Sequence, residues 1–153
     1  MPRILASLLV ALVALGCVPK PADVSTGAEE RSSASIGDVR TVAYDERTEL
    51  RPGETLEVKK TNSAFTFVRV VSDSRCPKGL DCIRAGEAKF LVTLPGGGSQ
   101  TVEVPADGRQ PVRFGIPDGT VTVHSLNPYP VARQQTEPGA YRLVVTVAKA
   151  ATM

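Results

Sequence analysis

The sequence predicts an all-β domain, an antiparallel β-sandwich that is immunoglobulin-like or barrel-like and has about seven or eight strands. Three observations predict this fold. Apolar and polar residues alternate with a period of two in short runs, and Pro- or Gly-rich turns separate these runs at spacings of roughly 8 to 12 residues. No stretch after Cys17 has a helical period. The runs lie within residues 38–149, which is enough chain for one domain with its own core.

The N-terminal segment has the layout of a secretory signal peptide. Arg3 precedes an uncharged apolar run, residues 4–15, which is shorter than the roughly 20 residues that a membrane-spanning helix needs. We therefore expect residues 1–16 to be a signal peptide.

The end of this segment, Val13-Ala14-Leu15-Gly16-Cys17, resembles the lipobox of bacterial lipoproteins, with Ala14 where leucine is usual. The resemblance implies cleavage before Cys17, attachment of palmitate and other acyl chains to that cysteine, and a membrane anchor in the cell envelope. Two or three acyl chains would anchor stably, whereas one holds weakly. Because Val18 is not aspartate, the resemblance implies the outer membrane in a Gram-negative cell, and otherwise the outer face of the plasma membrane. The alternative is an ordinary signal peptide that ends near a cysteine.

The chain after the anchor divides into three parts. Residues 17–37 begin with Cys17 and are rich in Pro, Ala, Ser, Thr, Gly and Glu without apolar periodicity, which predicts a flexible tether with a span of roughly 25 Å. Residues 38–149 form the predicted sandwich, and residues 150–153 are a tail.

The first two runs predict two strands. The turn residues 51–54 (Arg-Pro-Gly-Glu) precede a run in which Leu56 and Val58 face inward. Residues 64–71 carry apolar side chains on both faces, which is typical of a central strand covered on both sides.

The next two runs predict a hairpin. One run places Ala88, Phe90, Val92 and Leu94 inward, the other places Val102 and Val104 inward, and residues 95–98 (Pro-Gly-Gly-Gly) join them. The glycines lack the Lys-Ser/Thr of a phosphate-binding P-loop, so a turn is the simpler interpretation.

The C-terminal half predicts three further strands. Their inward residues are Val112, Phe114 and Ile116, then Val121 and Val123, then Tyr141, Leu143, Val145 and Val147. Between the last two strands, residues 127–130 (Asn-Pro-Tyr-Pro) predict a rigid corner with a possible cis bond at Tyr129-Pro130. Tyr129 either packs as a lid or forms an exposed contact.

Charge and motifs exclude several classes of function. The formal net charge is +2, or +1 without Arg3, which is too close to zero to indicate a nucleic-acid partner. A serine hydrolase would have to use Ser99 or Ser125 with His124, but neither serine lies in the Gly-x-Ser-x-Gly pattern of many such enzymes. Glu57, Glu87 and Glu103 face outward on their predicted strands, so we expect their carboxylates to be solvated and not catalytic. We therefore predict that the protein is not an enzyme and has no catalytic residues, cofactor or metal.

The two cysteines of the mature domain, Cys76 and Cys82, predict a disulfide, because an even pair in an exported protein is most simply oxidised. The bond would stiffen a crossover between two strands. A redox role would favour Cys-x-x-Cys spacing, and a zinc site would need more ligands than these cysteines and the outward His124.

Motifs around these cysteines resemble a group of uncharacterised bacterial secreted and lipid-anchored β-domains. They are Asp73-Ser74-Arg75-Cys76-Pro77, Cys82-Ile83, Ala85-Gly86-Glu87-Ala88, a late Pro128-Tyr129-Pro130 and a final strand at Tyr141. The resemblance covers roughly residues 48–148 and supports the fold and the location rather than an activity. In that group a tryptophan commonly precedes Ala-Gly, whereas this chain has Arg84.

The candidate binding residues are Asp73, Arg75, Asp81, Arg84 and Tyr129. Arg75 either pairs with a carboxylate and locks the cysteine loop, or joins Arg84 in a cationic edge for an anionic partner. Calcium at Asp73 and Asp81 is disfavoured because the ligand spacing of an EF-hand loop is absent.

Three hypotheses of function follow. The first is a monomeric, non-catalytic binding domain that is tethered to the membrane through Cys17 and binds an unknown protein or small molecule with its loops. The second is an inhibitor that presents the disulfide loop to an envelope or extracellular protease. The third is an enzyme of unrecognised type.

Overall fold

The structure, a computed structural model, describes residues 37–108 and 111–150. The predicted signal peptide, the lipidated Cys17 and the tether up to residue 36 lie outside these residues. No helix in the described ranges is long and apolar enough to span a membrane.

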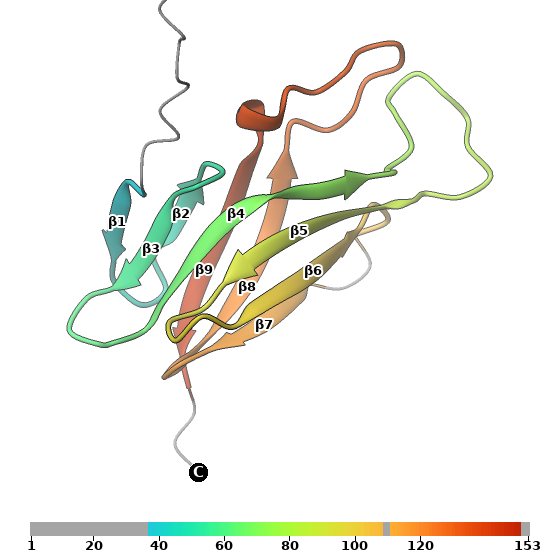
Figure 1. The fold of residues 1–153 in the computed structure, drawn as a ribbon. Helices are drawn as coiled ribbons and strands as arrows, with labels where there is room; N and C mark the ends of the chain where they lie inside the picture. The colour runs from blue at the N-terminus through green and yellow to red at the C-terminus, as the bar shows by residue number, and fades with distance from the viewer. Residues whose placement is uncertain (1–36, 109–110, 151–153) are drawn as a thin grey trace, which may run out of the picture. The chain divides into compact units, whose positions relative to one another are not determined.

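The described residues form nine strands in two sheets, which confirms the predicted all-β sandwich (Figure 1). The first sheet has the strand order β1 (Val39–Val42), β3 (Thr55–Val58), β4 (Ala64–Asp73), β5 (Glu87–Thr93) and β6 (Ser99–Pro105). The second sheet has the order β2 (Arg47–Leu50), β9 (Arg142–Lys149), β8 (Gly119–Asn127) and β7 (Val112–Ile116). A short 3₁₀-helix, η1 (Pro138–Ala140), precedes β9.

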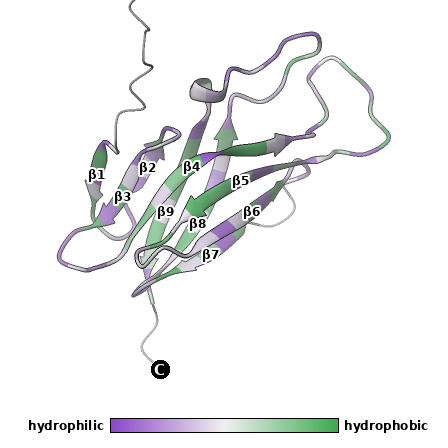
Figure 2. Ribbon diagram, in the orientation of Figure 1, coloured by the Kyte–Doolittle hydropathy of each residue, from purple (hydrophilic) through white to green (hydrophobic). Residues whose placement is uncertain are grey.

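The core lies between the two sheets. In β5, and in β9 up to Val147, every second residue is buried, and Figure 2 shows the hydrophobic residues along β5. The ring of Phe114 in the second sheet contacts Phe65 and Phe90 in the first sheet edge-on, with centroids 5.2 and 6.5 Å apart. Within the bounds of β5, β8 and β9, every residue that the sequence predicted to point inward is buried.

Two strands were not predicted, and one pairing differs from the antiparallel pattern. β1 and β2 each bury only their last residue, Val42 and Leu50, so neither shows the alternation that identified the equally short β3. β1 pairs in parallel with β3, whereas the other strand pairs of the described sheets are antiparallel.

β4 also differs from the prediction that both of its faces are covered. Phe65 and Phe67 point into the core, but Val71 is 45% exposed. The register against β5 shifts between Phe67 and Arg69 and again between Val70 and Ser72. Each β-bulge adds a residue and restarts the alternation, so successive apolar residues do not require two covered faces.

The two longest connections between strands lie at one end of the sandwich. Residues 74–86 join β4 to β5, and residues 128–141 join β8 to β9 and include η1 (Figure 1). We call this part of the molecule the loop end. It contains most of the candidate binding residues that the sequence predicted.

Candidate functional site

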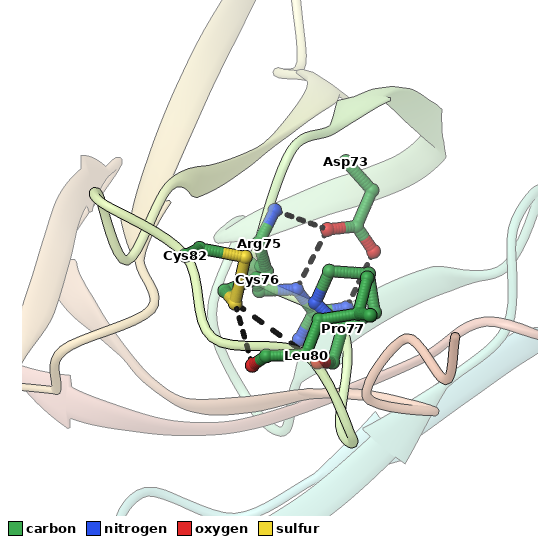
Figure 3. Close-up of a disulfide and its surroundings, with 6 residues drawn as sticks. All are labelled: Asp73, Arg75, Cys76, Pro77, Leu80 and Cys82. Atoms are coloured by element: carbon green, nitrogen blue, oxygen red, sulfur yellow. Dashed lines mark hydrogen bonds and ion pairs between the residues drawn. A yellow bond between two sulfur atoms is a disulfide. The ribbon is translucent and has the colours of Figure 1, made fainter.

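Arg75 is the central residue of the loop end. Its side chain is only 4% exposed, and it forms a two-pronged ion pair with Asp73 (Figure 3). Nε donates to Oδ1 of Asp73 at 2.8 Å and Nη2 donates to Oδ2 at 2.6 Å. This fork geometry is the strong form of an arginine–carboxylate pair. Of the two predicted arrangements, the structure therefore has the one in which Arg75 locks the loop.

The same guanidinium connects the β4–β5 loop to the end of β8. Nη1 donates to the carbonyl of Leu126 at 2.7 Å, and Nη2 donates to the carbonyl of Pro128 at 3.0 Å. The ring of Tyr129 lies 4.9 Å from the Arg75 guanidinium, and Lys78 approaches the same ring at 5.8 Å. Tyr129 is half-buried, so it acts as a lid on Arg75.

Asp73 is held as a carboxylate by this arrangement. Burial alone would raise the pKa of Asp73, but the hydrogen bonds and the positive charge of Arg75 outweigh it, and the pKa lies below its ordinary value of 3.8. The hydroxyl of Tyr141 donates to Oδ2 of Asp73 at 3.2 Å. Burial and the adjacent Asp73 charge raise the pKa of Tyr141, so this hydroxyl keeps its proton.

The predicted disulfide joins Cys76 and Cys82 in the β4–β5 loop, with their Cα atoms 5.9 Å apart. Beside it, the backbone N–H of Cys76 donates to the carbonyl of Ala85 at 2.7 Å. The bond and this contact close the loop at its neck. The loop was predicted to be a crossover, but it joins the neighbouring antiparallel strands β4 and β5 of one sheet and is a long hairpin connection.

Gly86 completes the neck. Its φ is +75°, and a Cβ atom at this position would lie 1.9 Å from the carbonyl oxygen of Ser74. Only glycine fits so close an approach of two backbones. The Ala-Gly pair of the sequence motif therefore has a structural reason.

The two loops of the loop end are also bonded to each other. Lys78 donates its N–H to the carbonyl of Pro130 at 2.9 Å and accepts from the N–H of Ala132 at 3.2 Å, forming a short parallel bridge with Val131. Together with Arg75, this bridge fixes the position of one loop relative to the other.

An open groove of about 640 Å³ lies between β4 and the β8–β9 loop. One wall is formed by Val70, Val71, Ser72 and Asp73 of β4. The opposite wall comes from residues 130–136, and Arg75 and Tyr141 lie among the lining residues. This volume is within the range of about 300 to 1,000 Å³ that is usual for ligand sites.

Large apolar side chains are exposed around the same loops. Val71 is 45% exposed, Leu80 56%, Ile83 104% and Val131 39%, and the structure's described ranges contain one further residue of this kind, Val39 in β1. The sequence reasoning missed all four. A signal was present for two of them, because Leu80 lies inside the cysteine loop and Ile83 directly follows it, in a polar segment that offers an apolar side chain no core.

The remaining predicted site residues lie apart from the ion pair. Asp81 and Arg84 are exposed on the disulfide loop. Arg75 is buried, so the predicted cationic edge of Arg75 and Arg84 does not form. Within the described ranges no three His, Cys, Asp or Glu side chains come close enough to hold a metal.

Two further details concern residues near β8. His124 is exposed and shares a hydrogen bond of 2.7 Å with the hydroxyl of Thr146. The expected cis bond at Tyr129-Pro130 was wrong in position, because the cis peptide is the preceding X-Pro bond, Asn127-Pro128.

Comparisons of the chain with protein-family models, with curated proteins and with solved structures found no match.

Proposed function

We propose that the protein is a non-catalytic binding module of the cell envelope, anchored through lipidated Cys17, and that it contacts a partner protein with its loop end. The observation that carries the proposal is that four of the five exposed large apolar residues of the described ranges belong to the loops of this end or to the adjoining part of β4: Val71, Leu80, Ile83 and Val131. Exposed apolar side chains that cluster, instead of lying scattered, are typical of protein interaction sites.

The rigidity of the loops supports the same function. The disulfide, the Arg75–Asp73 pair and the Lys78–Val131 bridge hold the apolar side chains on a fixed support. A preorganised surface loses less conformational entropy on binding, so more of the contact energy remains as affinity.

The test places a photo-crosslinking amino acid at Ile83 of the full-length protein in living cells. The control position is Asn62, which is exposed in the β3–β4 turn, away from the loop end. We expect a discrete crosslinked product from position 83 that is absent from position 62. The partner recovered from that product should bind the purified domain, and Ile83→Asp should weaken its binding at least tenfold.

The proposal is wrong if both positions give the same products, or if Ile83→Asp and Leu80→Asp leave the affinity for the recovered partner unchanged. Turnover of a substrate that one polar substitution abolishes would instead indicate an enzyme.

A protease inhibitor is the second candidate, and one observation favours it. Ile83 is fully exposed directly after Cys82 and could enter the specificity pocket of a protease. Equimolar protein should then abolish the activity of a secreted or envelope protease, and Ile83→Asp should restore that activity. Cleavage of the loop without inhibition would contradict this candidate.

A further inference from the structure

β4 continues well beyond its neighbour β3. The pairing of β3 with β4 ends at Thr55 opposite Thr66, and two backbone bonds extend it only to Phe67. On its other side, β4 stays paired with β5 as far as Asp73. In Figure 1, β4 projects past β3 toward the loop end. Within the described ranges, residues 68–73 therefore have a strand on one side only.

The groove of about 640 Å³ runs along this open edge. The second β-bulge of β4 lies between Val70 and Ser72, so neighbouring residues of this stretch can line the same hollow. Here four consecutive residues, Val70, Val71, Ser72 and Asp73, line the hollow. The groove therefore runs along residues 70–73, within the part of β4 that has no paired strand on its β3 side.

The far wall keeps the groove open. Residues 130–136 form this wall, and it is joined to β4 through the bonds of Arg75 to Asp73 and Pro128, and to the disulfide loop through the Lys78–Val131 bridge. The open edge, six residues long, spans roughly 20 Å, which is the length of an ordinary strand.

The groove has an uncompensated positive charge. Its charged lining residues are Asp73, Arg75 and Arg133, and the first two neutralise each other. Arg133 is exposed, and no carboxylate among the described residues lies within ion-pair distance of it. Arg69, the β4 residue just before those that line the groove, is exposed as well.

We propose that the open edge of β4 binds an extended acidic segment of a partner protein, which adds to the first sheet as a further strand. The segment would bond to the backbone of residues 68–73, place apolar side chains on Val71 and Val131, and direct a carboxylate to Arg133. This inference rests on the proposed function and names the class of partner.

The experiment uses the mature full-length protein and a phage-displayed library of random eight-residue peptides as the probe. We expect enrichment of peptides that combine alternating β-branched or aromatic residues with Glu or Asp. Selection on Arg133→Glu should lose the acidic preference, and the affinity of an enriched peptide should fall about fivefold. Arg113→Glu is the matched control, because Arg113 is exposed on β7 and its replacement changes the charge equally.

Backbone pairing is tested separately from side-chain contacts. Alternate N–H groups of a bound strand point to opposite sides, so two analogues of an enriched peptide are methylated on alternate sets of nitrogens. One analogue should lose binding more than tenfold and the other should retain it. Within residues 69–73, the amide N–H groups that point away from β5 should exchange fast in the free protein and slowly in the complex.

Several results would overturn the inference. They are a library without enrichment, equal binding of the two methylated analogues, and binding that leaves the exchange of residues 69–73 unchanged. Slow exchange in the protein alone would mean that the edge is already filled, by a second copy if it depends on concentration and by the chain's own N-terminal segment if it does not. If specific crosslinking from Ile83 succeeds while the edge fails these tests, the proposed function stands and only this inference falls.

Discussion

Arg75 is a cation that the fold has removed from water, and its partners explain how the fold tolerates it. The ion pair with Asp73 and the two carbonyls of Leu126 and Pro128 satisfy the guanidinium on several sides. A buried charge is costly unless it is paired and hydrogen-bonded in this way. Removal of one partner leaves the other as an unpaired buried charge. It should therefore lower the free energy of unfolding by more than the intact pair contributes to it.

Arg75→Met should lower the free energy of unfolding by about 3 to 5 kcal/mol, because it leaves the buried Asp73 carboxylate without its cation. Urea unfolding followed by circular dichroism measures this change. Arg84→Met is the control and should stay within about 0.5 kcal/mol, since Arg84 is exposed. Equal losses in the two variants would contradict the central role of Arg75.

The titration of Asp73 predicts how stability depends on acid. The folded-state pKa of Asp73 is lowered from 3.8, so the folded state favours the ionised carboxylate. Its contribution is complete above the unfolded-state value and is lost as the pH falls through the folded-state pKa. Urea unfolding from about pH 6 to about pH 2 should show this loss in the native protein, and a shallower loss in Asp73→Asn. Parallel curves for the two proteins would refute the assignment.

Among the elements, the neck of the β4–β5 loop has the least tolerance for change. Gly86→Ala would push a methyl group into the carbonyl of Ser74, and the backbone would have to move. We expect a loss of at least about 2 kcal/mol in the free energy of unfolding, measured in urea.

Gly97→Ala separates this clash from backbone strain. Gly97 has φ +88°, similar to Gly86, but an added Cβ at Gly97 meets nothing within 4 Å. Its replacement should therefore cost only about 1 to 2 kcal/mol, the penalty of a left-handed residue alone. If the two variants lost equal stability, the close approach to Ser74 would not be the cause.

The strands show which elements a sequence can predict. β5 and β9 alternate over seven and eight residues, and both were predicted with the correct inward faces. β1 and β2 depend on pairing with β3 and β9, which local alternation does not report. In β4 the bulges break the period of two, so its covered face was predicted wrongly.

For the whole molecule, the resemblance of residues 13–17 to a lipobox predicts where the domain resides. Labelling with radioactive palmitate should mark the protein in cells, and Cys17→Ser should abolish the label. Labelling of the Cys17→Ser variant would contradict the lipoprotein prediction. Protease added to intact cells then locates the domain: digestion indicates the outer surface, and digestion only after lysis indicates the periplasm.

The candidate site was predictable in part at this scale. The even pair of cysteines in a chain with a signal-peptide pattern predicted the disulfide, and a pairing of Arg75 with a carboxylate was one of two predicted arrangements. The groove was not predictable, because its walls come from β4 and residues 130–136, which are far apart in the sequence. Neither segment has a motif that indicates the other, and only the packing of the two sheets brings them together.

The bond from Arg75 to the carbonyl of Leu126 spans 51 residues, which has a consequence for the order of folding. Contacts between distant parts of a chain form late, because closing a long loop costs entropy before any contact offsets it. The hairpins β5–β6, β7–β8 and β8–β9 can form first, and the loop end assembles once the two sheets have docked. Interactions that form only after the folding transition state stabilise the folded protein and slow its unfolding. Arg75 and its partners therefore determine how long the loop end, once formed, stays closed.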